Sequence, residues 1–299
     1  MIFRILFALL LILGTVTAYA FDFGGLVKEI TKEPDAAPVE AQQPTKQPGL
    51  LGLLGETPVE EEVAIGREIT GRLLGAAPLV DDKRLQRYIN RVGSWVAKQS
   101  GRAELKWHFG VIEADDINAF AAPGGYILVT KGLYKKLRSE AELAGVLAHE
   151  VGHVIKKHHL KILKQGQMLD MGSGILKQKV GDEGKDQAIG KMIGSGAEIL
   201  ARGLDKEAEY EADRIGVVLA ARAGYDAYGL PTVLQEIGHV SGDDSSVALL
   251  FKTHPHPEKR LVELGDAMDE HFDQFEGGKI LTNRLYKLAS MEKASHKIK

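Results

Sequence analysis

The chain contains no cysteine, and this absence removes several classes of protein at once. A disulfide framework, a thiolate zinc finger, an iron–sulfur cluster and a cysteine nucleophile are all excluded. Any metal ion must therefore be held by histidine and carboxylate side chains. The absence of cysteine is also compatible with an oxidising compartment outside the cytoplasm.

An excess of positive charge is also lacking, because 38 Lys and Arg face 41 Asp and Glu and the net charge is −3. Proteins that hold nucleic acid through its phosphates are basic, so we expect no nucleic-acid partner. Hydrophobic residues make up 44% of the 299 positions, which is typical of a globular chain with a real core. This length predicts one or two domains.

Long apolar runs are missing except at the N-terminus. The apolar run 5–13 follows a basic residue, and small residues stand at Ala18 and Ala20. This pattern predicts a signal peptide over 1–20, cleaved before Phe21, and a periplasmic or secreted mature protein. The alternative is an N-terminal membrane anchor, because the 17-residue stretch that ends at Phe21 approaches the minimum that spans a bilayer.

Proline and glycine are unevenly distributed. Five of the ten prolines lie in residues 21–58, which predicts a Pro-rich linker. We expect the ordered domain to cover 59–265, followed by a C-terminal helix and tail over 266–299. Nine of the 34 glycines fall in 166–203, and their density predicts a mobile helical flap.

Hydrophobic periodicity predicts a mostly helical α+β fold. Apolar residues at i+3 and i+4 predict helices, alternation predicts strands, and Ser139 with Glu142 predicts a capped helix that runs to about Lys161. The remaining helices are expected over 60–74, 82–98, 206–223, 226–238 and 257–275, and the strands over 105–112 and 126–130.

The capped helix carries the sequence His149-Glu150-Val151-Gly152-His153. Histidines four residues apart lie on one helix face, so both can reach one metal ion. The glutamate between them can reach a metal-bound water without ligating the metal, which is the H-E-x-x-H pattern of zinc peptidases. The flanking residues are apolar, so the helix is expected to be buried and its ionisable groups paired or metal-bound.

A zinc site needs a third protein ligand, and an acidic segment, 207–213, offers several. Glu209 and Asp213 share a helix face, so one can ligate zinc while the other accepts a hydrogen bond from a ligand histidine. Spacing alone does not choose among Glu207, Glu209 and Glu211. His158 and His159 stand in a basic run and are interpreted as a solvated helix end.

These motifs resemble the HtpX-like family of zinc metallopeptidases, which includes the CAAX prenyl endopeptidases and the mitochondrial Oma-type protease. The pattern that resembles it is His149-Glu150-x-x-His153 with Glu209-x-x-x-Asp213, and further similar segments are 118–133, 140–147 and 254–260. The likeness is to the secreted, periplasmic bacterial members. It implies a gluzincin-like domain with a small antiparallel sheet beside the zinc helix.

The resemblance implies roles for individual residues. One zinc ion per chain would be held by His149, His153 and Glu209, with Asp213 supporting the site. Glu150 would be the general base that activates the zinc-bound water.

A loop stiffened by prolines, 254–257, offers further candidates. His254, His256 and Arg260 are the nearest in sequence that can serve as a fourth ligand or as a donor to the transition state. In periplasmic relatives the histidine of this loop can occupy the open zinc position and keep the enzyme latent. By position that residue is His254, and a plain structural loop is the alternative.

Substrate is expected to add to a sheet edge by main-chain hydrogen bonds. We predict that the strand 126–130 presents this edge, with Gly125, Tyr126, Ile127 and Leu128 alongside the peptide. An ordinary core strand is the alternative.

The sequence is compatible with two functions. The first is an endopeptidase of the cell envelope that cleaves misfolded or membrane-associated proteins. The second is a zinc-stabilised periplasmic chaperone or assembly factor with latent or secondary proteolysis. The expected partners are unfolded or extended proteins, with outer-membrane protein assembly components and a peripheral membrane contact as further candidates.

Overall fold

The computed structural model describes residues 56–174, 203–242, 244–268 and 277–288. The expected signal peptide lies outside these residues, as do most of the linker, the glycine-rich segment from 175 to 202 and the end of the tail. The described helices and strands, in chain order, are α3 (Val59–Ala76), α4 (Lys83–Ala97), β1 (His108–Ile112), β2 (Ala119–Ala122), β3 (Tyr126–Thr130), α5 (Lys131–Lys136), α6 (Glu140–Ile155), α7 (His158–Gly174), α9 (Lys206–Arg222), α10 (Gly229–Gly238), α11 (Ser245–Thr253), α12 (Pro257–Met268) and the 3₁₀ turn η2 (Thr282–Arg284).

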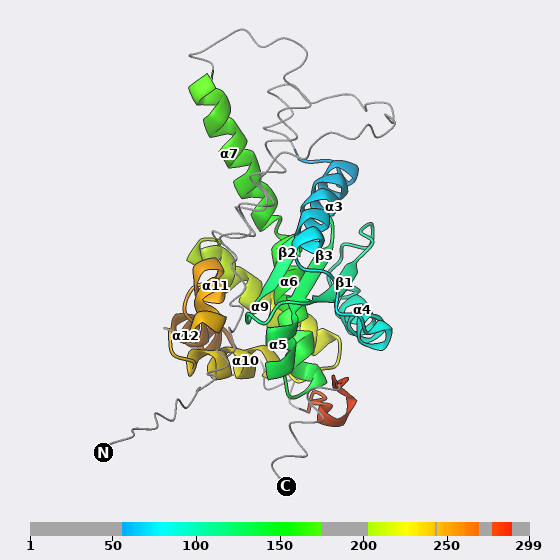
Figure 1. Cartoon of the computed structure of the whole chain (residues 1–299). Coiled ribbons are helices and arrows are strands. Elements are labelled where there is room, and N and C mark those ends of the chain that lie inside the picture. Colours follow the sequence, from blue (N-terminus) through cyan, green and yellow to red (C-terminus); the bar gives the residue numbers. More distant parts are fainter. Residues whose placement is uncertain (1–55, 175–202, 243, 269–276, 289–299) are drawn as a thin grey trace, which may run out of the picture.

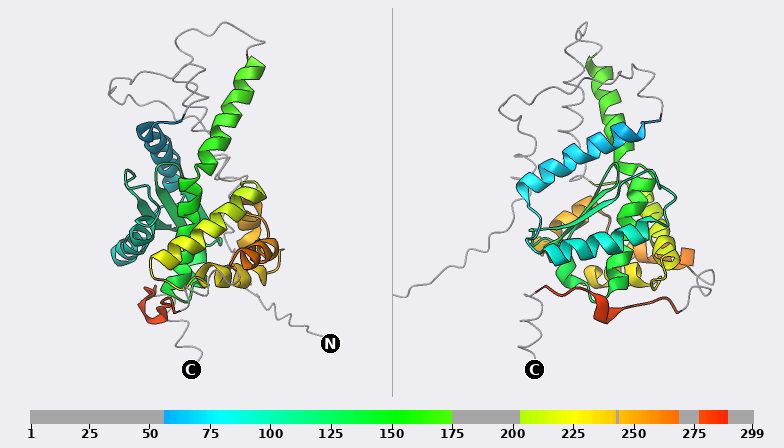
Figure 2. Two further views of the ribbon diagram at one scale, coloured as in Figure 1. Left: turned by 180° about the vertical axis from the view of Figure 1, so that it is seen from behind. Right: turned by 90° about the vertical axis from the view of Figure 1, so that its right-hand side faces the viewer.

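Helix α6 forms the centre of the molecule. It lies between the sheet with α4 on one side and α9 and α10 on the other, while α7 extends away from the body (Figures 1 and 2). Fifteen of its 16 residues, Glu140 through Val154, are buried. A helix that is covered all round is a rigid support for the groups it carries.

Capping side chains begin the two helices that sequence predicted most firmly. Asp82 accepts hydrogen bonds from the backbone N–H groups of Arg84 and Leu85 and starts α4. Ser139 accepts a hydrogen bond from the N–H of Glu142 and starts α6. Each side chain satisfies a donor that a helix N-terminus would otherwise leave without a partner.

The sheet is mixed rather than antiparallel throughout. Its strand order is β1-β3-β2, and β3 pairs with β1 in parallel and with β2 antiparallel. The mostly helical α+β class is confirmed, while the expected antiparallel sheet is corrected in this detail.

The prediction that β3 forms the substrate edge is wrong. Tyr126, Ile127 and Leu128 lie in the central strand, so their backbone groups face two neighbours. Gly125 precedes that strand, and its carbonyl accepts a hydrogen bond from His108.

The outer edge of β1 is covered by side chains of a neighbouring helix. Side chains of α4 occupy the outer edge of β1, because Gln86 bonds both backbone groups of Val111 and Asn90 bonds both of Phe109. Such coverage removes β1 as a template for pairing. The remaining outer strand is β2, which sequence did not predict.

Helix α6 ends at Ile155, six residues before the predicted end. Lys157 adopts a left-handed backbone conformation with φ of 55°, and α7 begins at the next residue. Residues other than glycine rarely adopt this conformation. Because the residue here is lysine, the sequence contains no glycine or proline that would indicate a helix break at this position. It changes the surroundings of the histidines that follow.

No helix among the described residues combines the length and the apolarity that crossing a bilayer requires.

Candidate metal centre

Two helices supply most of the candidate site. His149, Glu150 and His153 lie on α6, and Glu209 and Asp213 lie on α9; all five are buried. The helices pack closely because a glycine of α9, Gly216, lies against the backbone of His149, where an added Cβ would come within 2.9 Å of its nitrogen. This close packing sets the acidic residues of α9 against the histidines of α6.

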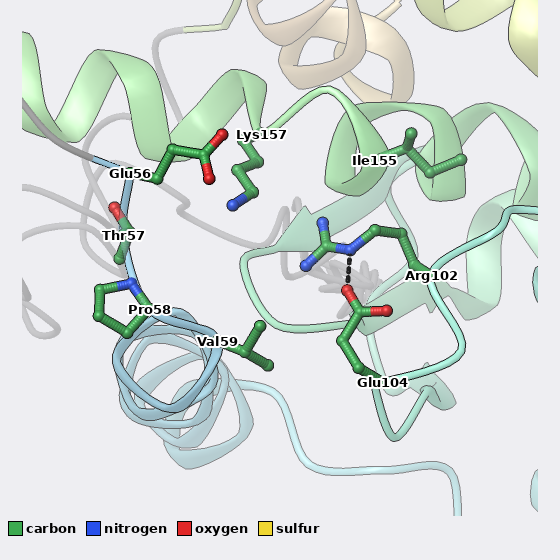
Figure 3. A pocket seen from close by; sticks show the side chains of 8 residues that line it. All are labelled: Glu56, Thr57, Pro58, Val59, Arg102, Glu104, Ile155 and Lys157. Carbon is green, nitrogen blue, oxygen red and sulfur yellow. Dashed lines mark hydrogen bonds and ion pairs between the residues drawn. The ribbon is translucent and has the colours of Figure 1, made fainter.

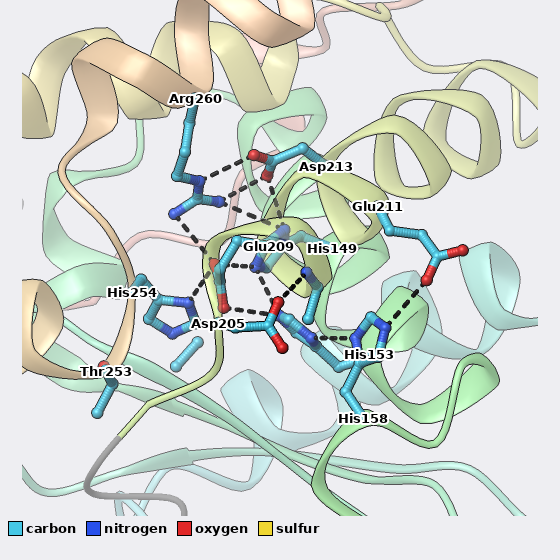
Figure 4. A network of polar contacts seen from close by, with 12 residues as sticks. His149, His153, His158, Asp205, Glu209, Glu211, Asp213, Thr253, His254 and Arg260 are labelled. Atoms are coloured by element: carbon cyan, nitrogen blue, oxygen red, sulfur yellow. Dashed lines mark hydrogen bonds and ion pairs between the residues drawn. The ribbon is translucent and has the colours of Figure 1, made fainter. Parts of the chain in front are cut away.

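Four side chains converge on one point. His149, His153, Glu209 and His254 each offer a ligand atom, and these atoms all lie within 4.8 Å of one another (Figure 4). The two Nε2 atoms of His149 and His153 are 3.0 Å apart, and Glu209 oxygens lie 3.6 and 3.5 Å from them. The structure thus brings the three predicted ligands together with His254, which the sequence offered as a candidate fourth ligand.

Hydrogen bonding shows that this cluster suits a cation. The Nδ1 atom of His149 lies 2.8 Å from Asp213, so it carries the proton and Nε2 presents a lone pair to the cluster. Glu209 Oε1 is buried and accepts no hydrogen bond from any described residue. Lone pairs and an unpartnered carboxylate oxygen that face one another favour a bound metal ion. Histidine nitrogen and carboxylate oxygen without thiolate are ligands that zinc accepts.

Asp213 supports His149 and is itself held by Arg260. The guanidinium of Arg260 donates to both carboxylate oxygens, at 2.8 Å and 2.6 Å. Burial alone would raise the pKa of Asp213, but Arg260 and His149 outweigh it and hold the pKa below its usual value. Asp213 is therefore charged and fixes the orientation of His149.

Arg260 was predicted as a candidate donor to the transition state, and its contacts give it another position. It is buried against Asp213, and its Nη1 lies 3.6 Å from Glu209 Oε2. Its guanidinium therefore binds the carboxylates of α9, Asp213 and Glu209.

The two histidines of the proline-stiffened loop, His254 and His256, lie in different surroundings. His254 is buried, and its Nδ1 donates to Glu209 Oε2 over 2.8 Å. Burial opposes its charge, but the Glu209 carboxylate outweighs this and raises the pKa of His254. His256 is exposed and packs on Phe251 instead, so it takes no part in the cluster.

Glu150 is buried beside the cluster on the same helix as the two histidines. Burial raises the pKa of its carboxyl group, and the charges of His149 and His254 oppose the shift. A carboxylate with a raised pKa is a better proton acceptor, which is what a general base requires.

Sequence reasoning missed His158. The expected solvated helix end is wrong for this residue, because it is only 6% exposed and its Nδ1 lies 3.0 Å from Nδ1 of His153. Glu211 contacts Nε2 of His158 at 3.1 Å and is not one of the four residues of the cluster. Glu207 is exposed to solvent. Of the three glutamates that spacing left open, only Glu209 reaches the centre.

A separate surface pocket of about 450 Å³ lies beside the start of α3 (Figure 3). Its lining includes Arg102, Glu104 and Lys157, and none of the residues of the metal cluster. Buried Glu62 contacts both Arg102 and Lys157, at 3.1 Å and 3.5 Å. These ion pairs tie the break after α6 to helix α3.

Comparison with known proteins identifies the family. Residues 83–267, which include every residue of the cluster, match Peptidase family M48. The chain belongs to this family. The expected resemblance to an Oma-type metallopeptidase family is thereby confirmed, and the members of this family are zinc-dependent peptidases.

Named relatives agree with this assignment. The chain is 31% identical over 212 residues to the beta-barrel assembly-enhancing protease of Yersinia pestis, covering 69% of this chain and 43% of the relative. It is 29% identical over 235 residues to the protein of that name from Escherichia coli (strain K12), covering 76% and 48%. It is 30% identical over 194 residues to mitochondrial metalloendopeptidase OMA1 of Arabidopsis thaliana, covering 64% and 38%. The chain thus spans about half the length, or less, of these relatives.

Proposed function

We propose that this M48 chain is a zinc-dependent endopeptidase. The observation that carries the proposal is the convergence of His149, His153 and Glu209 beside buried Glu150. This is the arrangement of three protein ligands and a carboxylate base that metal-assisted peptide hydrolysis needs. We propose one zinc ion per chain.

Each residue has a distinct part in this chemistry. Bound zinc supplies a water of lowered pKa and polarises the peptide carbonyl. The Glu150 carboxylate takes a proton from the attacking water and passes it to the leaving amine. Asp213 holds the proton on Nδ1 of His149, and Arg260 keeps Asp213 charged.

We propose that His254 restrains the resting enzyme. Its ring lies with the three ligands, and its bond to Glu209 holds it there. A fourth protein group at the centre competes with water and substrate for the open position. Displacement of the loop that carries His254 would then activate the enzyme.

Extended substrate would pair with an outer strand of the sheet. The central position of β3 excludes it, and the edge of β1 is covered by Gln86 and Asn90, so we assign this part to β2. Main-chain pairing recognises an extended backbone more than a side-chain sequence. Unfolded or misfolded proteins are therefore the proposed substrates.

We place this activity in the cell envelope. The supporting observations are the signal-like sequence at residues 1–20 and the similarity to beta-barrel assembly-enhancing proteases. The relatives' name refers to beta-barrel assembly, which supports the outer-membrane protein assembly components expected from the sequence as candidate partners. A peripheral membrane contact would follow from such substrates.

Substrate capture tests this proposal. The variant Glu150→Gln keeps the ligands and the shape of the site but lacks the base, so it should retain bound substrates. We expect mass spectrometry to find envelope proteins enriched on this variant over wild type. The control is His149→Ala with Glu150→Gln, which should lose the enrichment together with the zinc. Equal sets of captured proteins on all three would contradict the proposal.

A further inference from the structure

The two α6 histidines of the cluster receive different support on their outer ring nitrogens. His149 Nδ1 meets a carboxylate, that of Asp213, at 2.8 Å. His153 Nδ1 meets another histidine, His158, at 3.0 Å, and His158 Nε2 meets Glu211 at 3.1 Å (Figure 4). The chain His153–His158–Glu211 thus runs outward from the metal centre.

Only one assignment of protons lets every member of this chain serve the cluster. His153 presents the Nε2 lone pair inward, so its Nδ1 carries hydrogen and donates to Nδ1 of His158. His158 then carries its hydrogen on Nε2 and donates it to Glu211 Oε2. The carboxylate at the outer end therefore fixes the tautomer of both rings.

The helix break at Lys157 makes the chain possible. In a continuous helix, residues five apart are turned by roughly 140° about the axis, so His158 would point away from His153. The left-handed conformation of Lys157 interrupts α6 and returns His158 to the same side. A conformation that lysine rarely adopts is retained here, as at sites where the surrounding structure holds it in place.

Ion pairs stabilise the outer end of this hydrogen-bonded chain and the helix break beside it. Lys156 contacts Glu211 Oε1 at 2.6 Å, which leaves Oε2 for His158. Lys157 contacts buried Glu62 on α3 at 3.5 Å. Glu211 is 35% exposed, whereas His158 is buried, so the chain leads from the protein interior to its surface.

We propose that His158 and Glu211 are positioning residues for His153. They fix its ring orientation and tautomer so that Nε2 faces the metal. This inference rests on the proposed zinc site and adds a second support to that of Asp213. It gives a role to a histidine that the peptidase mechanism does not use.

Zinc affinity measures this role without peptidase activity. We propose to titrate the full-length protein with zinc against a fluorescent zinc chelator. Replacing His158 by Phe keeps a ring but removes both hydrogen bonds, and we expect zinc to bind roughly 10–100-fold more weakly. Glu211→Leu should weaken binding in the same direction. His158→Gln offers an amide oxygen and an amide N–H in similar places, so it should restore part of the affinity.

A matched control lies about one turn away from Glu211 on α9. Glu207 is exposed and outside the hydrogen-bonded chain, so Glu207→Leu should bind zinc as wild type does. The visible absorption of the cobalt(II)-substituted protein adds a second readout, because it reports ligand geometry. We expect His158→Phe to change this spectrum and Glu207→Leu to leave it unchanged.

The outcomes separate the two proposals. Wild type that binds no zinc would overturn the proposed function itself. Wild type that binds zinc, with His158→Phe and Glu211→Leu equal to it in affinity and cobalt spectrum, would overturn the positioning role alone. If circular dichroism shows that His158→Phe does not fold, the Glu211→Leu variant, whose substitution lies at a partly exposed position, decides the question by the same two measurements.

Discussion

His254 is the residue that we propose keeps the enzyme latent. Its ring lies among the proposed zinc ligands and donates to Glu209 over 2.8 Å. A group that restrains the open position should increase turnover when it is removed. We predict that His254→Ala degrades casein faster than wild type.

The control for this prediction is the neighbouring histidine of the same loop. His256 is exposed and packs on Phe251, so His256→Ala should cleave casein at the wild-type rate. A fall of His254→Ala to background would contradict latency and would show that His254 supports the active state.

Asp213 links the site to acid stability. Its pKa is lowered in the folded protein, chiefly because Arg260 and His149 outweigh its burial. A group of this kind stabilises the fold above its unfolded pKa of about 3.9, and the contribution is lost as pH falls towards the folded pKa. Asp213→Asn removes the charge and leaves buried Arg260 with the more distant Glu209 as its carboxylate partner, so we expect a cost of up to about 3–5 kcal/mol at neutral pH.

Urea unfolding of the zinc-free protein at pH 7 and pH 3 checks this prediction. The variant should be much less stable than wild type at pH 7, and the difference should be smaller at pH 3, which lies below the unfolded pKa of Asp213 but above its folded pKa. The exposed carboxylate Asp81 provides a control, because Asp81→Asn should follow wild type at both values. A constant difference between Asp213→Asn and wild type would contradict the account.

At the scale of elements, the contact between α6 and α9 decides whether the ligands meet. A Cβ on Gly216 would lie 2.9 Å from the nitrogen of His149 and 3.0 Å from its Cα. Backbone atoms of a buried helix cannot move aside easily, so the helices must separate. We predict that Gly216→Ala lowers the free energy of unfolding by about 1–3 kcal/mol and weakens zinc binding.

A glycine on an exposed helix face supplies the comparison. Gly71 of α3 has no atom within 4 Å of an added Cβ, so Gly71→Ala should be neutral or gain up to about 1 kcal/mol. Urea unfolding and zinc titration of both variants make the test. Equal stability of Gly216→Ala and wild type would show that the close packing does not position the site.

Sequence predicted the helices with clear periodicity or caps and missed the short elements. Ser139 caps α6 as expected, and Asp82, where the helix 82–98 was expected to begin, caps α4. Strand β2 has the sequence Ala-Phe-Ala-Ala, and alanine is depleted in strands, so nothing marked it. Without β2 the sheet was misjudged, and β3 was taken for its edge.

The break after α6 shows a second limit of sequence reasoning. Lys157 is neither glycine nor proline, and its conformation depends on tertiary contacts such as that with Glu62. The predicted helix continued through the break to about Lys161, and the basic residues around His158 indicated a solvated helix end. The role of that histidine could be found only from its distances to His153 and Glu211.

At the scale of the molecule, the site joins segments that are far apart in the chain. The H-E-x-x-H helix could be predicted from spacing alone, whereas Glu209 was chosen only by resemblance to a family. His254 reaches the cluster because α11 and α12 bring their connecting loop to α9 (Figures 1 and 4). Such long-range meetings depend on how helices pack, which local patterns do not specify.

The proposed activity depends on Glu150 as the base that activates water for peptide hydrolysis at a zinc ion held by this chain. The direct measurement is casein degradation by wild type and Glu150→Gln at equal zinc content, in both the native and the His254→Ala backgrounds. The account predicts full zinc occupancy in both and a rate lower by about 10²–10⁴-fold for Glu150→Gln. Full zinc occupancy without Glu150-dependent cleavage in either background would contradict it and favour a zinc-stabilised chaperone.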